Sequence, residues 1–100
     1  MIVENYPCLE QFFGSYFHQD WDIEHDEPSD VIRAYLENEP LEQIRKVGLE
    51  LKSLLSSCDD EELVRCLFEL GCYYDPLDDF TSISVWLKLI YEDICKKLIN

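Results

Sequence analysis

Apolar residues recur at spacings of three and four along most of this 100-residue chain, and the two-residue alternation of a half-buried strand is absent. Leu9, Phe12, Phe13 and Tyr16 form the first such stripe, and Leu41, Ile44, Val47 and Leu51 begin the longest. The pattern predicts an all-α fold, a compact single-domain bundle of about five helices that occupies residues 1–100.

Residues that start and stop helices mark the ends of the stripes. Pro7 opens the first helix, and the second runs from Pro28 or Ser29 to Asn38. Pro40 ends the second helix and opens a third, which reaches Ser56. The acids of 59–62 begin a fourth helix that Gly71 terminates, and Thr81 or Ser82 caps a last helix through Leu98.

The inward positions of these stripes predict the hydrophobic core. We expect the following residues to be buried: Phe13, Tyr16, Phe17, Leu36, Ile44, Leu51, Leu67, Trp86, Leu87 and Ile90.

The charge of the chain is strongly negative and unevenly distributed. There are 22 acidic and 8 basic residues, a formal net charge of -14, and no lysine or arginine precedes Arg33. A nucleic-acid binder needs lysine and arginine against phosphate, so this class is disfavoured. An anionic surface of this strength favours a cationic partner.

The cysteines indicate a reducing compartment. Their number is five, which is odd, and no Cys-x-x-Cys pair or signal peptide is present, so we expect a cytoplasmic protein with free thiols packed as small hydrophobic groups. No segment approaches the roughly 18 apolar residues of a membrane span, and no membrane partner is expected.

Two irregular segments, 19–27 and 72–80, combine acids with aromatic residues and are the candidate partner-binding surface. In the first, acids recur at every second residue, which would place them on one side of an extended chain. Trp21 is either an interface anchor or the core residue that closes the first helix, and of Tyr73 and Tyr74 one is expected to pack inward. The candidate binding residues are Asp20, Trp21, Asp22, Glu24, Asp26, Tyr74, Asp75, Asp78 and Asp79.

A metal site and a catalytic site are both disfavoured. His18 and His25 lie among acids, yet no helical i, i+4 histidine pair occurs and no cysteine joins them. Asp75 with Asp78 or Asp79 could supply paired carboxylates, but no nucleophile and base pair accompanies them. We expect no enzyme activity, no cofactor and no metal.

Two motifs resemble those of immunity proteins from bacterial contact-dependent growth inhibition systems. They are Tyr-Phe-His-Gln-Asp-Trp at 16–21 and Gly-Cys-Tyr-Tyr-Asp-Pro at 71–76. The resemblance spans nearly the whole chain, and it implies a single immunity-type helical domain. It also implies a small intracellular inhibitor, without catalysis, that binds the toxin domain delivered by a neighbouring cell.

Charge and resemblance agree on the partner, the cognate toxin C-terminal domain. A nuclease toxin must present a cationic groove, which an anionic protein can fill or flank. The alternative is an acidic adaptor or a mimic of nucleic acid that binds a basic protein, and either protein is expected to be a monomer when free.

Overall fold

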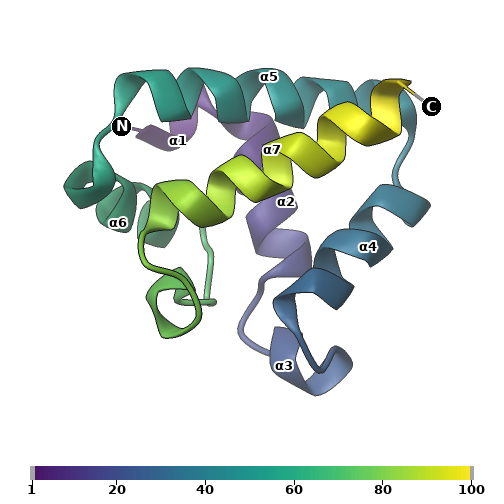
Figure 1. Ribbon diagram of the computed structural model, residues 1–100, viewed down its shortest axis with the longest axis horizontal. Coiled ribbons are helices and arrows are strands. Elements are labelled where there is room, and N and C mark those ends of the chain that lie inside the picture. Colours follow the sequence, from purple (N-terminus) through teal and green to yellow (C-terminus); the bar gives the residue numbers. More distant parts are fainter. Residues whose placement is uncertain (1, 100) are drawn as a thin grey trace.

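The computed structural model describes residues 2–99, which form seven α-helices and one 3-10 turn and contain no strand (Figure 1). The order is α1 (Ile2–Asn5), α2 (Pro7–Tyr16), α3 (Trp21–Glu24), α4 (Pro28–Asn38), α5 (Leu41–Ser57), α6 (Asp60–Glu69), η1 (Pro76–Asp78) and α7 (Ile83–Ile99). The all-α prediction is confirmed, and the five helices expected from the sequence are α2, α4, α5, α6 and α7. The short elements α1, α3 and η1 were not expected.

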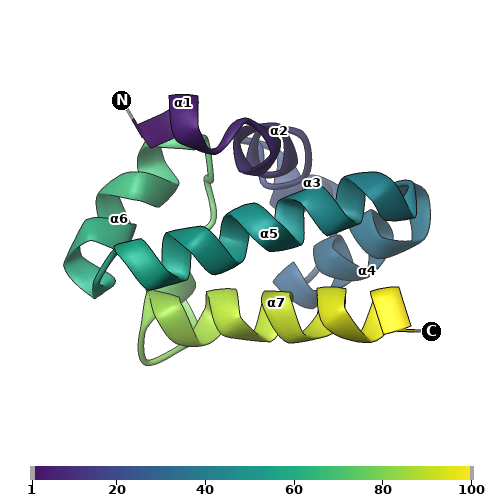
Figure 2. The ribbon, with the colours of Figure 1, turned by 90° about the horizontal axis from the view of Figure 1, so that it is seen from above.

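The two longest helices, α5 and α7, lie side by side and antiparallel in both views (Figures 1 and 2). Gly48 lies on the face of α5 that meets α7. A Cβ atom at Gly48 would come within 3.0 Å of the Ile94 Cγ2 atom, closer than side chains normally approach. The glycine therefore allows the two helices to pack closely at this point.

Helix α2 is capped by an acid that is distant in the sequence. Its first turn starts at Pro7, and the N–H groups of Cys8 and Leu9 donate to Glu50 Oε1 on α5, at 2.9 and 3.0 Å. These N–H groups have no partner inside α2, and a carboxylate is favoured at the positive end of a helix. Glu50 thus joins α2 to α5.

Helix α6 starts and ends as its sequence predicts. The Glu62 N–H donates to Asp59 Oδ1 at 2.9 Å, and the Asp59 N–H donates to Glu62 Oε1 at 3.0 Å, a reciprocal capping box. Gly71 follows with a φ of 85°, and the Cys72 N–H donates to the Leu67 carbonyl at 3.0 Å. Glycine adopts this left-handed conformation without the steric cost of a Cβ atom, so it commonly closes helices.

The core is rich in aromatic residues. Of the ten predicted core residues, eight are buried, whereas Tyr16 and Leu36 are only half-buried and pack against its edge. The Tyr16 hydroxyl donates to Glu39 Oε2 at 2.9 Å, so its polar end stays at the surface. Within residues 2–99 no helix is long and apolar enough to span a membrane.

Replacing the buried Leu51 by alanine should lower the free energy of unfolding by about 2–5 kcal/mol, because the substitution leaves a cavity between α5 and its neighbours. Leu49 is on the same helix but 57% exposed, so Leu49→Ala should change stability by less than about 1 kcal/mol. Urea denaturation of both variants measures the difference. Equal, small losses would show that α5 does not turn Leu51 into the core.

The five cysteines should all be found as free thiols. The Sγ atoms of Cys58 and Cys66 are 3.8 Å apart, well beyond the roughly 2.05 Å of a disulfide. Burial and the neighbouring Cys58 raise the pKa of Cys66 to about 12, which disfavours the reactive thiolate. Alkylation in denaturant followed by intact-mass measurement should give five adducts, and three adducts would reveal a native disulfide.

Candidate functional site

Four aromatic rings bring the two predicted acidic segments together. Phe17, at the end of α2, lies with its ring centroid 5.3 Å from Trp86, 5.9 Å from Trp21 and 5.9 Å from Tyr74. The Trp21 and Tyr74 rings meet edge to face at 5.3 Å. The Tyr73 N–H also donates to the Phe17 carbonyl at 2.9 Å. Segments 19–27 and 72–80 therefore form one continuous part of the surface.

The first segment is helical in its centre, so the condition under which its acids would align, an extended chain, is not met. Residues Trp21–Glu24 form the single turn α3. Because a helix turns about 100° per residue, side chains two positions apart point in nearly opposite directions. Asp22 and Glu24 are both exposed, but they do not present one row of carboxylates with Asp20 and Asp26.

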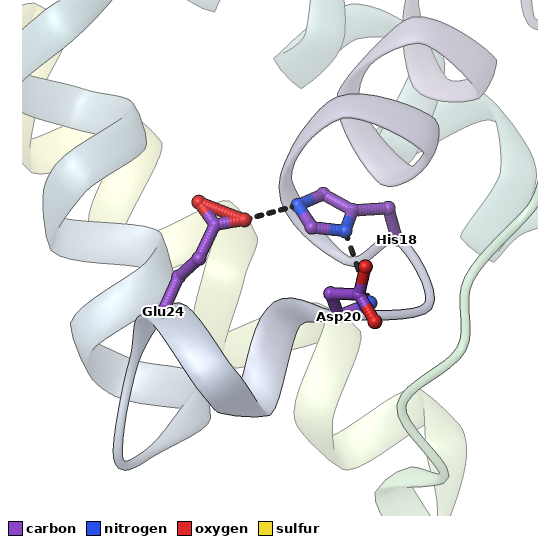
Figure 3. A network of polar contacts seen from close by, with 3 residues as sticks. All are labelled: His18, Asp20 and Glu24. Carbon is purple, nitrogen blue, oxygen red and sulfur yellow. Dashed lines mark hydrogen bonds and ion pairs between the residues drawn. The ribbon is translucent and has the colours of Figure 1, made fainter.

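His18 fixes the entry to α3 (Figure 3). Its Nδ1 atom accepts a hydrogen bond from the Asp20 N–H at 3.1 Å, and its Nε2 atom lies 2.6 Å from Glu24 Oε1. An Nδ1 atom that accepts a hydrogen bond carries no proton itself, so the proton of a neutral imidazole must be on Nε2, where it donates to Glu24. One uncharged tautomer thus satisfies both contacts.

In the second segment one tyrosine is buried and the other is exposed, as expected. Tyr74 packs inward and Tyr73 is exposed, so the predicted binding residue Tyr74 has its ring in the core. The Tyr74 hydroxyl donates to Asp79 Oδ2 at 2.6 Å, and burial together with this carboxylate raises the pKa of Tyr74. Tyr74 remains a neutral donor at physiological pH and orients Asp79. Asp75 caps η1 by accepting the Leu77 N–H at 3.0 Å.

A cleft of about 520 Å³ lies where these segments meet α4 and α7. Its walls combine three aromatic rings, those of Trp21, Phe80 and Trp86, with four carboxylates, those of Asp26, Glu27, Asp79 and Asp93. Rings attract cations through their faces, and carboxylates accept their hydrogen bonds. The cleft is chemically suited to a lysine or arginine side chain of a partner.

Three of the predicted binding residues line this cleft, and the others lie outside its lining. Trp21, Asp26 and Asp79 line it directly, and Trp21 is half-buried, so it serves both the core edge and the cleft wall. Asp20, Asp22 and Glu24 are on α3 and the turn before it, and Asp75 and Asp78 are exposed on η1 and its cap.

Several cleft residues were not among the sequence candidates, including Glu27, Phe80, Leu89 and Asp93. Phe80 could have been found, since it follows the acids of the second segment. Asp93 could not, because it is within α7 and reaches the cleft only through the tertiary fold. Among residues 2–99 no group of three or more histidine, cysteine or acidic side chains could hold a metal ion.

The geometry is that of a small all-α protein with a cleft lined by aromatic rings and carboxylates. Residues 5–94 match the family of CdiI immunity proteins, and the chain belongs to this family. The match confirms the family that the two sequence motifs suggested.

A solved structure supports the same relationship. The chain is similar to a chain in the crystal structure of the CdiA-CT/CdiI complex from Y. kristensenii, with a TM-score of 0.86 and 32% sequence identity over 94% of this chain and 98% of that one. A comparison with curated proteins gave no significant match.

At neutral pH, the imidazole nitrogen chemical shifts of His18 should identify the Nε2–H tautomer, because Nδ1 is used as an acceptor. Two-dimensional NMR of nitrogen-labelled protein makes the measurement. His25, the other histidine of the chain, is an internal reference. A dominant Nδ1–H form of His18 would contradict the network of Figure 3.

Proposed function

We propose that this chain is an immunity protein that binds and neutralises the C-terminal toxin domain of its cognate contact-dependent growth inhibition system. Membership of the CdiI family, over residues 5–94, is the observation that carries this proposal. The likeness to a chain from a CdiA-CT/CdiI complex supports it, because that fold is found with a toxin partner.

The acidic surface is the binding site in this proposal. The cleft can receive a basic side chain of the toxin between its rings and carboxylates, and the exposed acids of α3 and η1 surround it. A net charge of -14 would also steer a cationic toxin toward the complex. Steered association reaches about 10⁸–10⁹ M⁻¹s⁻¹ at low salt, so capture can precede damage.

The aromatic rings and carboxylates of the cleft are suited to binding, and inhibition of the toxin by binding alone requires no catalytic group. We infer that the protein acts as a single domain, monomeric when free, in the cytoplasm, where the toxin would reach its target. A nuclease is the toxin class that best fits an anionic inhibitor, since its substrate groove must be cationic. Occupation or flanking of that groove would exclude the nucleic acid without any catalytic step.

Reversing the charge of Asp22, Asp26 or Asp75 to lysine should slow association with the cognate toxin domain several-fold at low salt, since charges near an interface mainly set the on-rate. Glu92→Lys, on the exposed part of α7, is the control and should have a smaller effect. Glu50 is unsuitable as a control because it caps α2. Surface plasmon resonance at two ionic strengths provides the rates.

Two results would count against the acidic surface. One is an affinity that is the same at low and high salt. The other is a set of charge reversals that leave the rates unchanged while circular dichroism shows native helix content. Either result would move the inhibitory surface to an uncharged face of the protein.

A further inference from the structure

Four large apolar side chains converge on a groove of about 240 Å³ between α6 and segment 72–80. Val64 and Phe68 come from α6, Tyr73 from the segment, and Leu77 from η1. All four are exposed, with Phe68 at 83%. Single exposed apolar residues are common on proteins, but several gathered at one hollow mark an interaction site.

The local fold produces this arrangement without using these side chains for stability. Helix α6 turns Leu63, Cys66 and Leu67 into the core, so Val64 and Phe68, four residues apart, share its outer face. The turn at Gly71 then returns the chain beside that face. The groove thus lies between helix α6 and the chain that follows it, and its four apolar side chains are exposed.

Charge decides between the possible occupants. A second copy would bring together two chains that each have a net charge of -14, and these chains repel each other. Asp75, which lines the groove, would also be repelled by the negative charge of the second copy. A cationic partner experiences attraction at the same place. The described residues provide no cover for the groove, and Asp75 is the single charged residue among those that line it.

Resting on the function proposed above, we infer that this groove binds apolar side chains of the cognate toxin domain and forms the hydrophobic centre of the interface. The groove and the acidic cleft share segment 72–80, since Tyr73, Asp75 and Leu77 line the groove while Asp79 and Phe80 line the cleft. One partner can cover both hollows. The groove excludes water and slows dissociation, and the acids accelerate association.

Alanine substitutions at Phe68 and Leu77 test this inference. Each should weaken binding of the cognate toxin domain about tenfold or more, mainly through faster dissociation, because buried anchors dominate interface energies. The thermal midpoint of the free protein should not fall, because the two side chains are 83% and 52% exposed. The matched controls are Ile99→Ala, at 84% exposure, and Leu49→Ala, at 57%.

The outcomes separate the inference from the proposed function. If the wild-type chain does not bind the toxin domain, the proposed function fails and the inference falls with it. If the wild type binds and both groove variants bind equally well, only the inference is overturned. Sedimentation of the free protein adds a third outcome, since a dimer that Phe68→Ala dissociates would assign the groove to a second copy.

Discussion

The contact of Phe17 with Trp86, Tyr74 and Trp21 is the interaction that joins the two acidic segments to the core. Phe17 closes α2 and Trp86 belongs to α7, so these two rings are part of the core. The other two rings belong to the acidic segments. A surface that carries many like charges would tend to open through repulsion, and ring burial of this kind opposes that tendency.

The acids of this chain serve two distinct purposes. Some hold the fold together: Glu50 caps α2, Asp59 and Glu62 cap α6, and Asp60 accepts the Ser84 N–H at 3.1 Å near the start of α7. Others, such as Asp22, are exposed and contribute only to the field outside the protein. Because a carboxylate that accepts an N–H hydrogen bond keeps its charge, both groups of acids contribute to the net charge of -14.

The long helices could be predicted because each buries a regular stripe, and local signals such as Gly71 placed their ends within a residue or two. Helix α3 was missed because a single turn has no stripe and depends on His18 and Phe17 for its support. The capping of α2 by Glu50 and the place of Asp93 in the cleft could not be predicted, because both depend on tertiary packing. The apolar groove was missed because Phe68 breaks no helical pattern when it faces outward.

The stability of the protein comes from its buried core, so exposed side chains at the surface contribute little to it. Phe68 and Leu77 extend from a capped helix and a capped turn, and neither fills the core. Residues at such positions can be replaced by ones of different size or polarity with little loss of stability. Loss of stability usually limits how many substitutions a small domain tolerates. Substitutions at Phe68 and Leu77 can therefore change the surface of the protein, while Phe17, Trp86 and Glu50 keep the same scaffold.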